Sequence, residues 1–205
     1  MVAANMSGTI KRKLLVIGKS KKPRCFKGCK SLLVDYTNNR RAWMRSPVFE
    51  KWIRDWDYEL VKKNKKILLL VDNCPSHPQI KDLKSISLVF LTANTTAILQ
   101  PMDQGVIRAL KANFRKNLLI NTIDHLHADK DLSSVNITVL DAILMVYDAW
   151  NKISQETVSN CFRHAGFIDS FSRDVACSQI NVEDDVPVAL WVKTLNLQLQ
   201  VSDEM

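Results

Sequence analysis

The stretch Ile67-Leu-Leu-Leu-Val-Asp-Asn-Cys-Pro-Ser-His77 decides the fold class. Its uninterrupted apolar run, entered from a basic segment and ended by Asp72 and turn-forming residues, is typical of a strand buried on both faces. A second such strand is expected near Ser87–Leu91. The connection between the two exceeds a dozen residues, which is enough for the crossover that parallel strands require. The sequence therefore predicts an α/β fold.

Periodic patterns before and after this stretch predict further elements. A short apolar run at Leu14–Ile17 predicts a strand that leads into a basic loop. Ser46 and Pro47 suit the N-cap and first residue of a helix. The core-facing stripe of that helix is expected at Phe49, Trp52, Ile53, Trp56 and Leu60.

The second half of the chain is predicted to be helical. An amphipathic helix is expected to begin almost at Asp103, and two further helices are expected, over Leu140–Trp150 and from Ser154 to Gly166. We therefore predict a core domain over residues 1–122, a helical extension over 123–168 and an acidic, partly ordered tail over 169–205.

Composition excludes several classes of protein. The longest apolar run is far shorter than the roughly 20 residues of a membrane span, and the amino terminus lacks the pattern of a secretory signal. The five cysteines are scattered and odd in number, so reduced thiols are expected. Cys25 and Cys29 lack a second ligand pair at zinc spacing. We expect neither membrane insertion nor secretion.

Charge divides the chain into a basic front and an acidic back. Residues 1–118 contain 24 Lys and Arg against 8 Asp and Glu, whereas residues 119–205 contain 5 against 13. A basic half favours a polyanionic partner, most simply nucleic acid, because each neutralised phosphate releases counterions. A charged, solvated surface without such a partner is an equal alternative at this point.

Two aspartates occupy positions where α/β proteins place their chemistry. Asp72 ends a buried strand and Asp103 begins a helix, with thirty residues between them. Carboxylates at such an edge bind Mg²⁺ or Mn²⁺, and two ions about 4 Å apart support phosphodiester cleavage. Spacing alone favours the simpler roles of an Asx-turn and a helix cap. A haloacid-dehalogenase-type phosphatase is rejected, because Cys74 stands where that class has its second acid.

Several motifs occur in a fixed order along the chain. They are Leu14–Lys27, Ala42-Trp-Met44, Leu70–His77, Asn94-Thr-Thr96, Leu99–Ile107 and Asn160–Phe167. In this order they resemble the DDE domain of pogo and Tigger transposases and a motif downstream of it. The resemblance implies an RNase H-like mixed sheet flanked by helices, and cleavage and joining of DNA by two metal ions held by three aspartates.

The resemblance also assigns residues. The second and third aspartates of the family match Asp72 and Asp103, which would hold Mg²⁺ or Mn²⁺, while Asn73 and His77 match positions that orient these ligands. The first aspartate belongs to an Asp-Glu-Thr-Gly motif expected upstream of the segment matching Asn5–Thr9. We therefore expect a truncated domain without its opening strand and first aspartate. Asp35 does not replace it, since its context matches a different family position.

The resemblance, together with the basic charge of the front half, implies a transposon-derived DDE fragment in the nucleus that binds DNA and is inactive as a nuclease by itself. The resemblance leaves room for a homo-oligomer or a protein partner. Two alternatives remain: an active transposase or endonuclease, if a longer product carries the upstream motif, and a protein-interaction module or pseudogene product. The expected DNA contacts are Lys19, Lys21, Lys22, Arg24, Arg108, Lys111 and Arg115.

Overall fold

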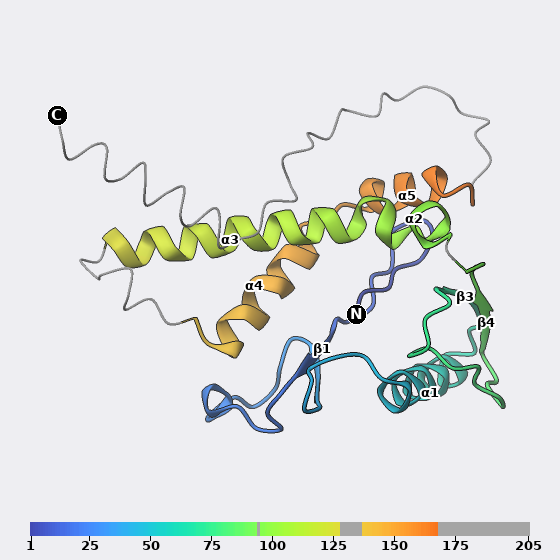
Figure 1. Cartoon of the computed structure of the whole chain (residues 1–205), viewed down its shortest axis with the longest axis horizontal. Coiled ribbons are helices and arrows are strands. Elements are labelled where there is room, and N and C mark those ends of the chain that lie inside the picture. Colours follow the sequence, from blue (N-terminus) through green and yellow to red (C-terminus); the bar gives the residue numbers. More distant parts are fainter. Residues whose placement is uncertain (94, 128–136, 168–205) are drawn as a thin grey trace.

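A computed structural model describes residues 1–93, 95–127 and 137–167 (Figure 1). The predicted tail over 169–205 and Asn94 lie outside the described residues. In chain order, the elements are β1 (Leu15–Gly18), a 3₁₀ turn (Arg24–Phe26), β2 (Asp35–Asn38), α1 (Ser46–Lys62), β3 (Ile67–Val71), β4 (Ile86–Phe90), α2 (Thr96–Leu99), the π-helical segment η2 (Met102–Val106), α3 (Ile107–His127), α4 (Val139–Asn151) and α5 (Gln155–His164).

The described strands form two parallel pairs. β1 pairs with β2, with Leu15 opposite Asp35, and β3 pairs with β4, with Val71 opposite Phe90. The three strands expected from apolar runs are confirmed, as is the α/β class. The short polar strand β2 was not predicted. The described residues contain two separate sheets, so the single RNase H-like mixed sheet stays a prediction.

Two layers of helices enclose these sheets, with α1 on one side and α3 to α5 on the other (Figure 1). Neighbouring residues at the start of β1 face opposite layers: Leu14, just before the strand, packs in the cluster with α4 and α5, whereas Leu15, its first residue, packs with α1. This alternation follows from the two-residue period of a strand. Leu68 of β3 is 63% exposed, so the strand is less covered than its apolar sequence predicts.

The layer formed by α1 has the predicted apolar stripe. Phe49, Trp52, Ile53 and Leu60 are buried against Val71 and Ile86 at the strand ends. The helix N-cap is Arg45, one residue before the predicted Ser46. The Ser46 hydroxyl instead donates to the carbonyl of Pro75, at 3.4 Å.

A buried carboxylate links α1 to the start of β4. Asp57 is 7% exposed and accepts backbone N–H groups from Lys84, Ser85 and Ile86 at 2.7 to 3.1 Å. Burial acts to raise the pKa of Asp57, but these three donors outweigh it and the pKa is lowered. An acid inside an amphipathic helix gives no sequence signal for this role.

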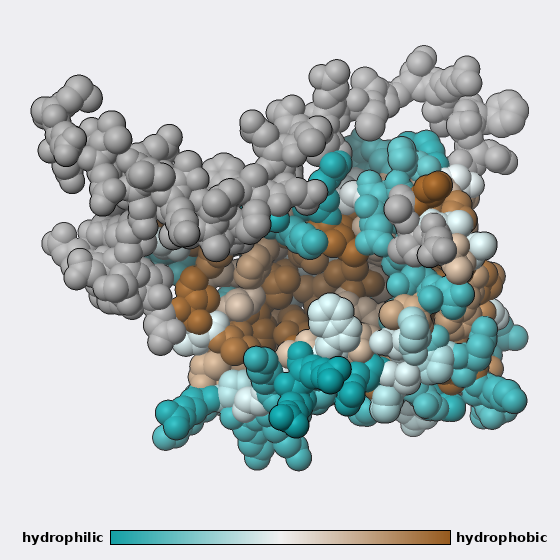
Figure 2. Space-filling model, viewed as in Figure 1, coloured by the Kyte–Doolittle hydropathy of each residue, from teal (hydrophilic) through white to brown (hydrophobic). Residues whose placement is uncertain are grey.

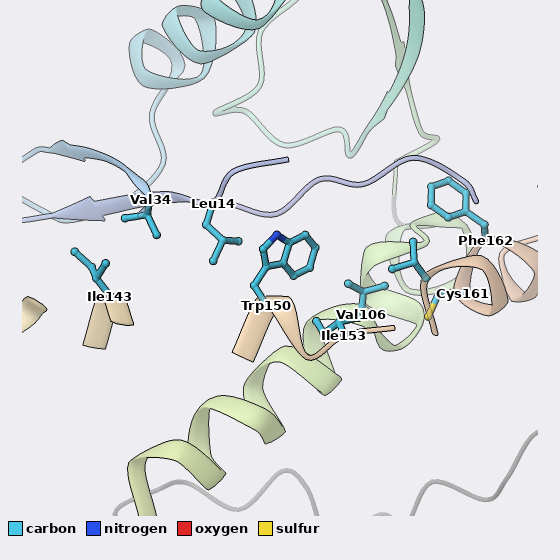
Figure 3. Close-up of a cluster of buried hydrophobic side chains, with 9 residues drawn as sticks. Leu14, Val34, Val106, Ile143, Trp150, Ile153, Cys161 and Phe162 are labelled. Carbon is cyan, nitrogen blue, oxygen red and sulfur yellow. The ribbon is translucent and has the colours of Figure 1, made fainter. Parts of the chain in front are cut away.

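The opposite layer holds the second core cluster (Figure 3). Trp150 of α4 is directed toward Leu14, and its indole N–H donates to the carbonyl of Arg12 at 3.0 Å. Lys11 donates from Nζ to the carbonyls of Trp150 and Ile153, both at 2.8 Å. The amino-terminal segment and the end of α4 are therefore joined by hydrogen bonds as well as by apolar packing.

The predicted helices of the second half are confirmed. Ser154 caps α5 by accepting the Thr157 N–H, and Gly166 follows the helix at a φ of 82°. The predicted division of the chain at residue 122 stays a prediction, and α3 continues through it to His127.

The surface is apolar in the middle of one face. Figure 2 shows brown residues below α3, with hydrophilic residues along the lower edge of the same face. Among the described residues, no helix combines the length and hydropathy that crossing a membrane requires.

Candidate metal centre

Asp72 follows β3 directly and lies at the carboxyl end of the β3–β4 pair. Its Oδ1 atom is 2.6 Å from Nδ1 of His77, and both side chains are partly buried. With its proton on Nδ1, the imidazole donates this hydrogen bond and fixes one carboxylate oxygen. The structure thus brings together Asp72 and His77, which the sequence placed in one motif.

The turn that carries His77 is held from two sides. The His77 N–H donates to the carbonyl of Cys74 at 2.8 Å, which closes the turn. The imidazole also packs on the Phe49 ring of α1, with ring centroids 4.3 Å apart. Asn73 is exposed at the start of this turn. The strand end, the turn and α1 therefore position the imidazole beside Asp72.

Asp103 lies in η2, immediately before α3. Gly105 interrupts the helical backbone here with a φ of 157°, a conformation that side-chain-bearing residues rarely adopt. A Cβ atom at this position would also lie 3.1 Å from Sγ of Cys161 in α5. Single-turn π segments recur at functional sites, and this one sets where Asp103 stands relative to α3.

Asp103 is an exposed residue that lies close enough to Asp72 to be affected by its charge. Burial raises the pKa of Asp103, the negative charge of Asp72 raises it further, and Lys111 acts in the opposite direction. Two carboxylates that repel each other in this way favour a cation between them, because the cation offsets both charges. The oxygen donors fit a hard divalent ion such as Mg²⁺ or Mn²⁺.

Cys74 adds a softer donor that the sequence analysis did not assign. Ligand atoms of Asp72, Cys74 and His77 lie within 4.8 Å of one another, the only such trio of His, Cys, Asp or Glu among the described residues. Thiolate and imidazole ligands suit Zn²⁺ and related ions. The Cys-x-x-His spacing within the turn was a signal for this proximity.

The expected DNA-contact residues fall into two groups. Lys19, Lys21, Lys22 and Arg24 are exposed in the loop after β1, and Arg108 and Lys111 are exposed at the start of α3. Arg115, one turn further along α3, is half-buried. Figure 1 shows the loop at the lower left and the start of α3 at the upper right. Only the α3 group adjoins Asp103.

The sequence pattern of a family described as DDE superfamily endonuclease matches residues 1–162. The chain belongs to this family. This DDE chain is of the pogo/Tigger type and transposase-derived. It is 37% identical to mouse Tigger transposable element-derived protein 4 over 166 residues. These residues cover 81% of the DDE chain and 32% of that relative. DDE superfamily endonucleases generally use divalent metals.

Other relatives are similar over the same domain. Mouse major centromere autoantigen B is 27% identical over 168 residues, which cover 82% of the DDE chain and 27% of the relative. ARS-binding protein 1 of Schizosaccharomyces pombe is 28% identical over 210 residues, covering 96% and 40% respectively. The DDE chain thus spans about a third of the length of these relatives. No solved structure matches it.

Proposed function

We propose that this chain is a DNA-binding DDE domain that holds one divalent cation weakly between Asp72 and Asp103 and does not cleave DNA by itself. The observation that carries the proposal is that Asp72 and Asp103 come from separate elements and lie close enough for the charge of Asp72 to act on Asp103. The sequence resemblance, which matches the two residues to the second and third aspartates of the family, supports it.

DNA binding is supported by charge and by the relatives. The basic residues at the start of α3 adjoin Asp103, so side chains able to bind phosphate would lie beside the carboxylates proposed to hold the cation. The name of ARS-binding protein 1 describes binding to a DNA element, and that of centromere autoantigen B describes a chromosomal location. By analogy with these two relatives, we propose that this chain also binds DNA and is located in the nucleus.

The predicted lack of cleavage rests on the number of carboxylates. Within the described residues, the trio around Asp72 contains a single carboxylate, and Asp103 interacts with it from a different element. Two-ion catalysis requires ligands that hold both ions against their mutual repulsion. When bound, one Mg²⁺ or Mn²⁺ would polarise a phosphate oxygen. The roles of this chain's residues are then to hold the ion and bind the DNA backbone.

The RNase H-like arrangement is part of the same proposal. Helices on both sides of parallel strands, with Asp72 at a strand end, are compatible with it. In that arrangement a further strand would lie beside β3, on the side where the described residues provide no paired neighbour.

The metal proposal is tested by Mn²⁺ titration followed by electron paramagnetic resonance. We expect one weak site that is lost in both Asp72→Asn and Asp103→Asn. Asp124→Asn, at an exposed acid on α3, is the matched control and should bind as the wild type does. A site that survives both substitutions would contradict the proposal.

The same proteins test cleavage. No metal-dependent cleavage of plasmid or oligonucleotide DNA is expected from the purified chain. Cleavage that disappears in Asp72→Asn and Asp103→Asn would show that another acid completes an active centre.

A further inference from the structure

The loop between β2 and α1 presents a tryptophan to solvent. Trp43 is 71% exposed, more than any other large hydrophobic residue in the described part of the chain. Isolated exposed apolar residues are ordinary on protein surfaces, but a Trp is the side chain with the greatest area for stacking. What surrounds Trp43 decides whether the exposure is functional.

The loop restrains the backbone that carries the tryptophan. The side chain of Asn39 accepts the N–H groups of Arg41 and Trp43 through Oδ1, at 3.1 and 3.3 Å, and donates from Nδ2 to the Trp43 carbonyl at 2.7 Å. Ala42 completes the turn with a φ of 51°. Three hydrogen bonds from one side chain restrict the backbone on both sides of the indole, which lowers the entropy lost when a ligand stacks on it.

An open cavity of about 550 Å³ lies beside the indole. Its lining residues are Arg41, Trp43, Met44, Arg45, Ser46 and Ser76. Ser76 belongs to the turn that carries His77, and the bond from Ser46 to Pro75 joins this turn to the start of α1. The cavity therefore borders the same turn as the candidate metal centre, and its volume suits a ligand the size of a nucleotide.

The charge around the cavity is positive. Arg40, Arg41 and Arg45 are exposed, and within the described residues none of them takes part in an ion pair. A guanidinium group forms two parallel hydrogen bonds with a phosphate. A planar aromatic ring flanked by arginines is the combination by which proteins hold the base and the phosphate of an unpaired nucleotide.

We propose that this cavity binds an unpaired nucleotide of DNA, with the base stacked on Trp43 and the adjoining phosphates bound by Arg41 and Arg45. The proposal rests on the proposed DNA-binding function and adds the kind of DNA structure recognised. A base within a duplex presents only its edges, because its faces are covered by its neighbours. Stacking on Trp43 therefore selects frayed, single-stranded or flipped-out nucleotides near the turn that follows Asp72.

Fluorescence anisotropy of the full chain with two labelled probes tests this: a single-stranded oligothymidine and a blunt duplex of arbitrary sequence. Trp43→Ala should weaken binding to the single strand about tenfold and change duplex binding less than about twofold. Trp43→Phe should restore most of the affinity. Tyr58→Ala is the control, since Tyr58 is also an exposed aromatic residue, at 62%, on α1 away from the cavity lining.

A second measurement addresses the arginines. Arg41→Gln and Arg45→Gln should each reduce the salt dependence of single-strand binding. The slope of log K against log salt should fall by about 0.7 for each phosphate that the variant no longer neutralises. Circular dichroism melts of each variant verify that the fold is kept.

The outcomes separate the two proposals. If the wild type binds both probes and Trp43→Ala changes neither affinity, or weakens both equally, the nucleotide pocket is wrong while DNA binding stands. If the wild type binds neither probe at low salt, the proposed function and the pocket both fail.

Discussion

The carboxylate of Asp57 in α1 accepts the backbone N–H of Ser85 at 2.7 Å, inside the core. This bond and its two companions fix where β4 begins, and β4 is the only strand paired with β3 among the described residues. Asp57 therefore positions β4, and β4 in turn pairs with β3, the strand that Asp72 follows.

Asp57→Ala is expected to lower the free energy of unfolding by about 3 kcal/mol, because the buried N–H groups of Ser85 and Ile86 and the partly buried one of Lys84 lose their acceptor. Chemical denaturation monitored by circular dichroism measures the loss. Asp55→Ala on the exposed face of α1 is the control and should change stability by less than about 0.5 kcal/mol.

The stabilisation by Asp57 should also depend on pH. The folded pKa of Asp57 is lowered, so its contribution is complete above the unfolded pKa, near 3.9, and is lost as the pH falls through the folded pKa. The stability difference between wild type and Asp57→Asn should therefore shrink below about pH 4. A difference that stays constant down to acid unfolding would contradict this account.

Asp103 is expected to behave in the opposite way. Its pKa is raised by burial and by Asp72, so ionising it costs stability as the pH rises from the ordinary carboxyl pKa through the raised one. In buffer with a metal chelator, Asp103→Asn should raise the melting temperature only slightly at about pH 7, because Asp103 is exposed and solvent screens its charge, and should leave it unchanged at about pH 3. Nuclear magnetic resonance of the Asp103 carboxyl carbon should show a lower pKa in Asp72→Asn, because one of its two causes has been removed.

A soft metal ion should bind at the turn after β3. Cd²⁺ is expected to bind Asp72, Cys74 and His77 and to produce the ultraviolet charge-transfer absorption of a cadmium–thiolate bond. Cys74→Ser should abolish the absorption, whereas Cys29→Ser, at an exposed cysteine outside the trio, should preserve it. An absorption that depends on Cys29 alone would place the ion elsewhere.

Binding of duplex DNA should be electrostatic and divided unequally between the two basic groups. Because the α3 group adjoins Asp103, Lys111→Gln and Arg108→Gln should each reduce the salt slope by about 0.9, the value for one phosphate on a duplex. Lys21→Gln, in the loop after β1, is the comparison. Affinity that stays the same from about 50 to about 200 mM salt would exclude a mechanism based on phosphate binding.

The extent to which the sequence predicts this fold depends on how local the determining interaction is. The strand at Ile67–Val71 and the stripe of α1 could be predicted because the apolar residues in each recur in a regular local pattern. β2 could not be predicted from the sequence, because Asp35-Tyr-Thr-Asn38 is polar and forms a strand only by pairing with β1. Its hydrogen bonds come from residues about 20 positions away, and no local pattern records them.

In the candidate site, too, local patterns could be predicted from the sequence, whereas contacts between distant residues could not. The rule that ligands gather at strand ends made Asp72 and Asp103 candidates, but spacing alone favoured an Asx-turn and a helix cap, and their pairing was expected only from the family resemblance. The positions of Cys74 beside His77 and of Trp43 beside Ser76 depend on how one turn folds against α1. The Cys-x-x-His spacing was a local signal that the sequence analysis did not use, and nothing near Trp43 in the sequence indicated that Asn39 would hold its backbone.

The bonds from Lys11 to the end of α4 have a consequence for how the protein is made. Their donor and acceptors are 139 and 142 residues apart, and at about 5 to 20 residues per second a ribosome needs roughly 7 to 30 s to synthesise the intervening chain. Throughout that interval Leu14 and Val34 lack the tryptophan and helices that later bury them. We therefore expect the newborn amino-terminal half to bind chaperones that recognise exposed apolar segments, and to be released from them once α4 and α5 have been synthesised.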